Sequence, residues 1–224
     1  VLGKTVKDLD FVVADGSVEL AKIVKRHFHG VWYSLDDEHQ SARVILKQGD
    51  ADELVLDFTA FIGETLEQDL RQRDFTINAM AIDLDNMEEV IDPLGGQNDL
   101  RDGKLRLGSP QSLISDPLRV LRAVRMVRTL ELSHTLEITE KLRVASKGLN
   151  RISGERIRDE LLKCLALPNL SLTYELLKDY GILDQLLHRT SEQESLKKLL
   201  ADSPGENLTK IDDDFEQSFL QTLE

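Results

Sequence analysis

Two aspartates separated by one residue, Asp8 and Asp10, lie near the start of the chain in a short apolar segment, residues 7–13. A turn signal at residues 14–16 follows, so the segment predicts a β-strand. Side chains two positions apart on a strand share a face, which places the two carboxylates together. Adjacent carboxylates repel each other unless a cation lies between them, and Mg²⁺, which prefers oxygen ligands and substrate phosphates, suits this position. The alternative is a pair of solvent-facing aspartates, because D-x-D alone is a common pattern.

A third carboxylate is predicted beside this pair. Residues 31–33, 42–46 and 54–58 also have the composition of strands. In the last of these, alternation places Leu54, Leu56 and Phe58 on one face and Asp57 on the other. Asp57 is therefore a candidate third metal ligand, although a lone aspartate on a strand is more often simply exposed.

A helix is predicted over residues 17–28, with Ser17 as its N-cap. His27 and His29 stand two apart at its end, which is compatible with metal binding but more typical of a helix terminus, where histidine suits the dipole. A short helical turn at residues 66–71 comes before the second polar group, Arg73 and Asp74. There, an arginine can bind phosphate oxygens and an aspartate can accept hydrogen bonds from sugar hydroxyls. The alternative is that the two residues pair with each other at a surface.

Four arginines recur every three residues in a predicted helix that runs from Asp116 and Pro117 to about Leu130. Asp is a good N-cap and Pro a good first helical residue. An apolar stripe repeats at the same interval. A row of guanidinium groups suits phosphates and base edges, whereas a merely solvated face usually mixes Lys with Glu. The row consists of Arg119, Arg122, Arg125 and Arg128.

Further helices are predicted at residues 136–145, 153–167 and 170–180, with a short one after Gly181. A turn at residues 91–96 marks the end of the sheet-containing part. The tail is acidic, and its Asp212–Asp214 run is assigned no function. The fold class is α+β: a head with a small mixed sheet over residues 1–100, a helical neck over 101–168, and a partial helical body with the tail over 169–224.

The composition, with 41% hydrophobic and 31% charged residues, is typical of a globular protein. A net charge of −13 argues against indiscriminate nucleic-acid binding, yet residues 101–170 carry fourteen Lys and Arg against eight Asp and Glu. No run of eighteen apolar residues predicts a membrane span. The single Cys164 fits a reducing compartment, so a cytoplasmic location is expected. The chain starts without a signal peptide, and we expect a preceding N-terminal piece.

These residues resemble the motifs of class II tRNA nucleotidyltransferases, the CCA-adding enzymes and bacterial poly(A) polymerases of the polymerase-β-like superfamily, over about residues 1–187. Residues 2–10 resemble the metal motif, which implies that Asp8 and Asp10 hold a catalytic Mg²⁺ pair. Residues 73–79 are similar to the ribose motif, in which Asp74 would read the 2′-hydroxyl and Arg73 would contact the nucleotide. Residues 92–96 resemble the hinge between head and neck.

The remaining similarity lies in the neck. Residues 116–122 resemble the motif in which Asp116 and Arg119 face the incoming base as an amino-acid template, and residues 155–161 resemble the motif that supports it. Arg122 and Arg125 are expected near the triphosphate. The resemblance implies a polymerase-β-like head with a helical neck and body. It also implies a template-independent enzyme that adds C, A or both, from CTP and ATP, to the 3′ end of tRNA.

The chain departs from the family pattern at several positions. Ser115 stands where the family has Glu, Gln72 replaces the first of two arginines, and the Gly-Gly and Arg-Asp elements that would precede residue 2 are absent. Only residues 62–64 separate Phe61 from Thr65, where enzymes that build the whole CCA end carry a longer flexible loop and CC-adding enzymes typically lack it. Either the chain is a specialised enzyme or a mobile loop is missing from the sequence. A poly(A) polymerase and a non-catalytic nucleotide- or RNA-binding module remain alternatives, and no oligomeric state is predicted.

Overall fold

The computed structural model describes residues 7–36, 40–48 and 52–189. The predicted acidic tail and residues 2–6 of the metal motif lie outside the described residues. The chain divides into two compact units, Val1–Gln72 and Arg73–Glu224. Residues 73–100 therefore group with the helical unit, although the sequence analysis assigns them to the head. The predicted limits of the three domains stay predictions. Within the described ranges, no helix is long and apolar enough to cross a membrane.

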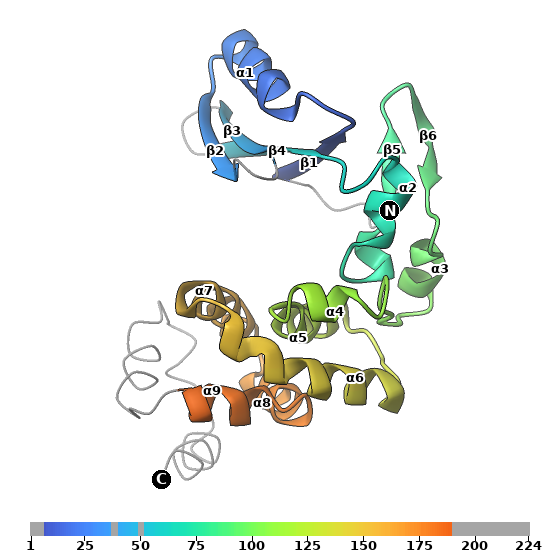
Figure 1. Ribbon diagram of the computed structural model, residues 1–224, viewed down its shortest axis with the longest axis vertical. Coiled ribbons are helices and arrows are strands. Elements are labelled where there is room, and N and C mark those ends of the chain that lie inside the picture. The colour runs from blue at the N-terminus through green and yellow to red at the C-terminus, as the bar shows by residue number, and fades with distance from the viewer. Residues whose placement is uncertain (1–6, 37–39, 49–51, 190–224) are drawn as a thin grey trace. The chain divides into compact units, whose positions relative to one another are not determined.

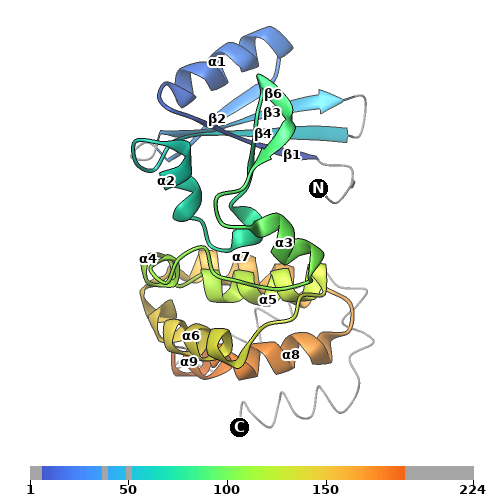
Figure 2. The ribbon, with the colours of Figure 1, turned by 90° about the vertical axis from the view of Figure 1, so that its right-hand side faces the viewer.

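The described residues of the first unit form a mixed sheet of four strands in the order β1-β4-β3-β2. Helix α1 lies across one face of this sheet (Figures 1 and 2). Strand β1 pairs in parallel with β4, while β4 with β3 and β3 with β2 are antiparallel. All the predicted strands are confirmed; the first is one residue shorter than predicted and the other three are longer. The elements are β1 (Asp8–Val13), α1 (Ser17–Phe28), β2 (Val31–Asp36), β3 (Ser41–Gln48) and β4 (Asp52–Ala60).

The alternation predicted for β4 is confirmed, and it decides which face of the sheet is buried. Leu56 and Phe58 are buried in a cluster with Ala21 of α1. Phe11 of β1 packs against the same cluster, and its ring stacks on that of Phe58 with 5.1 Å between centroids. Because side chains alternate along a strand, the residues between these positions point to the opposite face.

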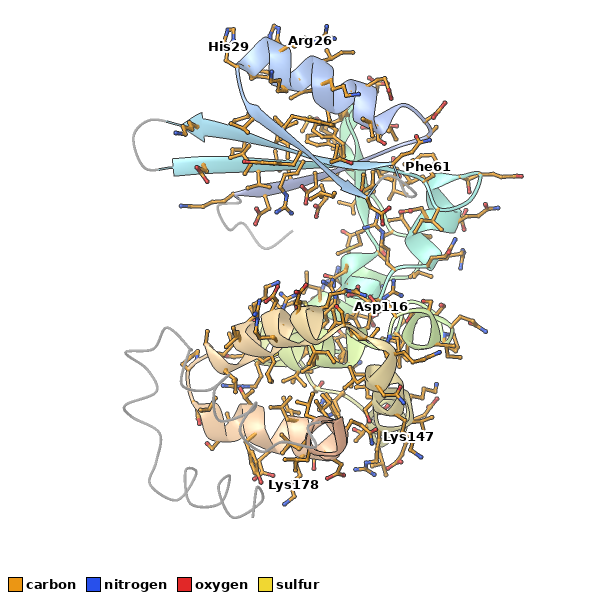
Figure 3. The ribbon with its side chains drawn as sticks, turned by 60° about the vertical axis from the view of Figure 1, so that its left-hand side comes forward. Arg26, His29, Phe61, Asp116, Lys147 and Lys178 are labelled. Carbon is orange, nitrogen blue, oxygen red and sulfur yellow. The ribbon has the colours of Figure 1, made fainter. Side chains whose placement is uncertain are left out.

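Helix α1 begins differently from the prediction. Its N-cap is Gly16, which adopts a left-handed conformation with φ of 72°, and Ser17 is already helical. The Ser17 hydroxyl does not cap the helix; it donates a hydrogen bond to the carbonyl of Gln40. At the other end His29, labelled in Figure 3, is the left-handed C-cap, and His27 lies in the last turn. The two histidines therefore mark the end of a helix, as the interpretation favoured in the sequence analysis predicts.

The link from β4 to helix α2 (Leu66–Arg71) is short and tightly bonded. Asp69, only 2% exposed, accepts a hydrogen bond from the Ile62 N–H at 3.0 Å. The Gln68 side-chain oxygen accepts one from the Glu64 N–H at 2.8 Å, and the Gln72 amide donates to the Ile62 carbonyl at 3.0 Å. Residues 62–64 are thus fixed by the side chains of the helix that follows them.

The second unit begins with the 3₁₀ turn η1 (Thr76–Asn78), a hairpin of β5 (Ala81–Asp83) and β6 (Asn86–Ile91), and helix α3 (Gly96–Arg101). The Asp92 carboxylate caps α3 by accepting from the Gly96 and Gln97 N–H groups at 2.7 and 2.9 Å. Burial raises the pKa of Asp92, but these backbone donors outweigh it and lower the pKa overall. A side chain at Gly96 would place its Cβ 2.1 Å from the Thr76 carbonyl oxygen, so only glycine fits.

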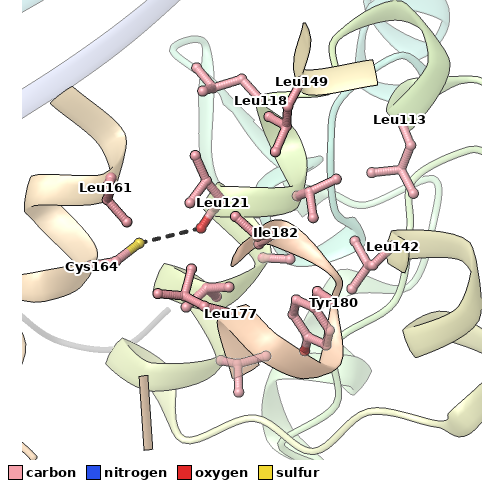
Figure 4. Packing of buried hydrophobic residues seen from close by; sticks show 14 of the residues in the cluster. Leu113, Leu118, Leu121, Leu142, Leu149, Leu161, Cys164, Leu177, Tyr180 and Ile182 are labelled. Atoms are coloured by element: carbon pink, nitrogen blue, oxygen red, sulfur yellow. Dashed lines mark hydrogen bonds between the residues drawn. The ribbon is translucent and has the colours of Figure 1, made fainter. Parts of the chain in front are cut away.

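Helix α5 is the centre of the helical part, and it contacts α4, α6, α7 and α8. The apolar stripe predicted on this helix is buried throughout. Figure 4 shows Leu121 beside Cys164, whose Sγ donates to the Leu121 carbonyl at 3.5 Å. The predicted helices are confirmed within one or two residues. They are α5 (Arg119–Leu130), α6 (Leu136–Ser146), α7 (Gly154–Leu165), α8 (Leu170–Asp179) and α9 (Ile182–Arg189). Two short elements were not predicted, α4 (Ser112–Ser115) and the 3₁₀ helix η2 (Lys147–Arg151).

Candidate functional site

One face of the sheet in the first unit, opposite α1, carries three carboxylates. Asp10 of β1 pairs in register with Asp57 of β4, and Asp8 pairs with Val55. Partners in register point to the same face of a sheet, so Asp8, Asp10 and Asp57 share what we call the carboxylate face. Asp8 and Asp10 are exposed, whereas Asp57 is half-buried. The structure thus brings together the three acidic residues singled out in the sequence.

A cation that the sequence analysis missed lies on the same face. Arg43 of β3 is the cross-strand partner of Asp57, and its Nε and Nη2 donate to the two carboxylate oxygens at 2.7 Å each. The hydrogen bond to Asp57 raises the pKa of Arg43 against the opposing effect of burial, and the charges of Asp8 and Asp10 raise it further. An arginine inside an apolar strand pattern was the available signal, but its partner follows only from the strand register.

The donors fit a hard divalent cation in part. Two exposed carboxylates on one strand face are suitable ligands for an ion that completes its shell with water and phosphate oxygens. Both oxygens of Asp57 already accept hydrogen bonds from Arg43. No group of three or more His, Cys, Asp or Glu side chains arranged for a metal occurs in the described part of the chain. The metal roles of Asp8, Asp10 and Asp57 stay predictions.

In the second unit, Asp74 is 4% exposed, and both of its carboxylate oxygens accept hydrogen bonds. Its Oδ1 accepts from the Phe75 N–H at 2.8 Å and from the Asn78 amide at 3.1 Å. Its Oδ2 accepts from Arg122 Nε at 2.7 Å, across 48 residues of sequence. Burial lowers the pKa of Arg122, but Asp74 more than offsets this and raises it. The carboxylate of the ribose motif is therefore held rigidly by an arginine of α5.

Asp116 and Arg119 lie near Asp74, because the charges of both carboxylates act on the Arg119 guanidinium. Asp116, which is labelled in Figure 3, follows α4 and precedes α5 in the chain. Its carboxylate accepts from the Leu118 N–H at 3.2 Å and pairs with Arg156 of α7 at 2.8 Å. Helix α5 starts at Arg119 rather than Pro117, so Asp116 caps the turn that leads into the helix. Desolvation lowers the pKa of Arg119, while the charges of Asp74 and Asp116 oppose that change.

These residues form one cluster of alternating charge, which we call the neck cluster: Asp74, Asp116, Arg119, Arg122 and Arg156. Arg73 is close enough for its charge to lower the pKa of Arg119. Guanidinium groups and carboxylates in fixed positions can present donors and acceptors to a base edge or a sugar. The structure therefore groups most of the residues predicted to bind nucleotide, although their roles stay predictions.

The other two arginines of the row point elsewhere. Arg125 pairs with Glu160 of α7 at 2.6 Å, and that carboxylate is only 5% exposed. Arg128 donates to the carbonyls of Pro168 and Asn169 and to Thr173 Oγ1 at 3.2 Å. Both bind neighbouring helices or their connections, which is a packing role. The predicted contact of Arg125 with the triphosphate stays a prediction.

Replacement of Glu160 by Ala is expected to lower the free energy of unfolding by about 3–5 kcal/mol, because it leaves Arg125 without its buried partner. Glu140→Ala is the matched control, since Glu140 pairs with Arg143 at 2.6 Å with both side chains about half exposed. That change should cost less than about 1 kcal/mol. Urea denaturation of both variants checks the difference, and equal losses would contradict the packing role of Arg125.

Comparison with known proteins places the chain in a family. Residues 1–106 match the family described as the poly A polymerase head domain, and residues 135–205 match the one described as the probable RNA and SrmB-binding site of polymerase A. The CC-adding tRNA nucleotidyltransferase of Geobacter sulfurreducens is 36% identical over 168 residues, covering 75% of this chain and 38% of the relative. The A-adding tRNA nucleotidyltransferase of Aquifex aeolicus is 43% identical over 141 residues, covering 55% of this chain and 16% of the relative.

The Thermotoga maritima CCA-adding enzyme, solved in complex with tRNA, superposes with a TM-score of 0.73 at 30% identity. That alignment covers 91% of this chain and 50% of the solved one. The chain thus spans half or less of the length of these three proteins. The predicted fold class, a nucleotidyltransferase head with a mixed sheet followed by helices, is confirmed. The two matched regions, in the order that the motifs predict, show that the chain belongs to the tRNA nucleotidyltransferase and poly(A) polymerase family.

Proposed function

We propose that the chain is the catalytic and nucleotide-selecting part of an enzyme that adds C residues from CTP to the 3′ end of tRNA. The observation that carries this proposal is the neck cluster, in which Asp74, Asp116 and Arg119 come together from separate segments. A binding module without catalytic activity would have no need of the exposed pair Asp8 and Asp10. Because the substrates are tRNA and a nucleoside triphosphate, we place the reaction in the cytoplasm.

The two units would contribute different parts of the chemistry. Asp8 and Asp10 would hold a divalent cation, which we propose is Mg²⁺. Such an ion, when bound, lowers the pKa of an attacking hydroxyl and neutralises phosphate charge. The rest of the proposed mechanism is positioning by this chain's own residues.

In the neck cluster, Oδ2 of the Asp74 carboxylate would accept a hydrogen bond from the ribose 2′-hydroxyl. A carboxylate oxygen has two acceptor sites, and Arg122 Nε occupies one site of Oδ2, whereas the Phe75 N–H and the Asn78 amide occupy both sites of Oδ1. Arg119 would donate to the base and Asp116 would accept from it, a pattern that suits C or A and rejects G and U. Arg122, with Arg125 as a second candidate, would lie near the triphosphate, and Arg73 would contact the nucleotide. The pairing of Arg122 with Asp74 would hold the ribose acceptor beside the guanidinium proposed for the triphosphate.

The choice of C over a complete CCA end rests on the connection before α2. Asp69, Gln68 and Gln72 fix residues 62–64 by hydrogen bonds at both ends, so the connection is a bonded turn rather than the remnant of a long loop. The Geobacter sulfurreducens relative, named CC-adding, supports the same choice. A-adding activity and poly(A) addition are the alternatives within the family.

Incorporation assays on three tRNA acceptors, ending before the CCA, after one C and after both Cs, test the proposal. With CTP and ATP together, the full-length protein containing this chain is expected to add C until two are present and then stop. A complete CCA end would contradict C-only addition, while A added only to the CC end would identify an A-adding enzyme. Long A tracts would identify a poly(A) polymerase, and no incorporation on any acceptor would overturn the enzymatic proposal.

A further inference from the structure

The carboxylate face contains its own cation. Arg43 and Asp57 are direct partners on β3 and β4, and their fork-to-fork contact uses both carboxylate oxygens at 2.7 Å. The contact is partly exposed, since 40% of the Arg43 side chain and 21% of the Asp57 side chain are accessible. Bidentate arginine–carboxylate pairs of this kind are among the stronger and better oriented ion pairs in proteins.

The position of Arg43 matters because the whole face is acidic. Asp10 lies beside Asp57 in register, and Asp8, two residues before Asp10 on β1, points to the same face. Three carboxylates on adjacent strands repel one another, and a guanidinium among them relieves that repulsion as a bound metal would. A divalent cation entering the same face meets a fixed positive charge.

We propose that Arg43 is a built-in counter-ion of the carboxylate face, which holds Asp57 in the metal-free protein and competes with a divalent cation for that carboxylate. The inference rests on the proposed function only in that Asp8 and Asp10 are taken as metal ligands. It assigns Arg43 a positioning role through Asp57 and no contact with substrate. Metal binding then requires the Arg43–Asp57 contact to loosen, and the pair sets how tightly the ion is held.

Titration of the chain with Mn²⁺, with free Mn²⁺ measured by electron paramagnetic resonance, tests this inference without reference to activity. Arg43→Gln removes the charge and is expected to tighten Mn²⁺ binding about tenfold. Arg43→Lys keeps the charge but loses the fork, so it should tighten binding by less. The melting temperature of Arg43→Gln should be lower than wild type without metal and should rise more than wild type when Mn²⁺ is added.

Arg71→Gln is the matched control. Arg71 pairs with Glu67 at the same 2.7 Å, but both are exposed residues of helix α2 and neither belongs to the sheet. This variant should bind Mn²⁺ as the wild type does. Asp57→Asn should weaken binding, because Arg43 is then released toward Asp8 and Asp10.

Unchanged or weaker Mn²⁺ binding by Arg43→Gln would overturn the counter-ion role, and weaker binding would show instead that Arg43 helps to form the metal site. If Arg43→Gln does not fold, Arg43→Lys replaces it in the test: tighter Mn²⁺ binding than wild type supports the counter-ion role, and unchanged or weaker binding overturns it. If folded wild type and variants all fail to bind Mn²⁺, the inference falls together with the metal role of Asp8 and Asp10. If binding tightens as expected while no acceptor is extended, the counter-ion role stands and the proposed function fails.

Discussion

Asp8→Asn and Asp10→Asn should each lower the rate of nucleotide incorporation by about 10³-fold or more and leave the fold intact. Each change removes one negative charge from the proposed metal ligands, and charge stabilisation by a catalytic ion is worth several kcal/mol, or about a factor of ten for each 1.36 kcal/mol. Both side chains are exposed at the surface of β1. The isosteric amide therefore disturbs no packed core, and thermal melting should show a transition close to that of the wild type.

Asp15→Asn is the appropriate control for this pair. Asp15 is also exposed, lies just after β1, and accepts a hydrogen bond from the Gly16 N–H at 2.7 Å, which an Asn side chain can replace. It should keep near wild-type incorporation. Retention of more than about a tenth of the wild-type rate by either Asp8→Asn or Asp10→Asn would exclude that residue as an essential metal ligand.

The sequence predicted the carboxylate face but not its charge balance. Alternation along β1 and β4 placed Asp8, Asp10 and Asp57 correctly, because the side-chain period of a strand is two regardless of context. Arg43 was missed because its partner is fixed by the antiparallel register of β3 on β4. Register is set by the hydrophobic patterns of both strands together with the turn that joins them, so the pattern of residues 42–46 alone does not identify the partner of Arg43.

The arginine row shows a second limit of pattern reasoning. An interval of three residues falls about 60° short of a full helical turn, so four residues at that interval sweep about half of the helix circumference. The row therefore winds around α5: Arg122 reaches Asp74, whereas Arg125 and Arg128 reach α7 and the connection to α8. The apolar stripe winds in the same way and stays buried only because helices surround α5 on several sides.

The hairpin of β5 and β6 and helix α3 were not predicted at all. β5 has three residues, and β6 is mostly exposed and contains Glu88 and Glu89, so neither shows the apolar alternation that identifies a strand. Helix α3 is six residues long and is defined by the Asp92 cap rather than by an apolar face. Elements as short as these contain too few residues to show a period, and the side-chain cap of α3 is a local contact that a periodicity analysis does not detect.

Asp74→Ala should have two separable effects. It removes the acceptor proposed for the 2′-hydroxyl, so the preference for CTP over dCTP, measured as the ratio of the two kcat/KM values, should fall at least about tenfold. It also leaves Arg122, Asn78 and the Phe75 N–H without a shared acceptor, which should lower the free energy of unfolding by about 1–3 kcal/mol. Steady-state kinetics with both nucleotides and urea denaturation measure the two effects independently.

Arg122→Ala distinguishes ribose recognition by Asp74 from a purely structural role of the pair. It breaks the same 2.7 Å ion pair and should cost similar stability, but it leaves the Asp74 carboxylate in place, still bonded to Phe75 and Asn78. If Asp74 reads the ribose, Arg122→Ala should raise KM for CTP and dCTP alike and keep the preference between them. If both variants lose that preference equally, the ion pair serves only to order the site; if neither does, the ribose is selected by another residue.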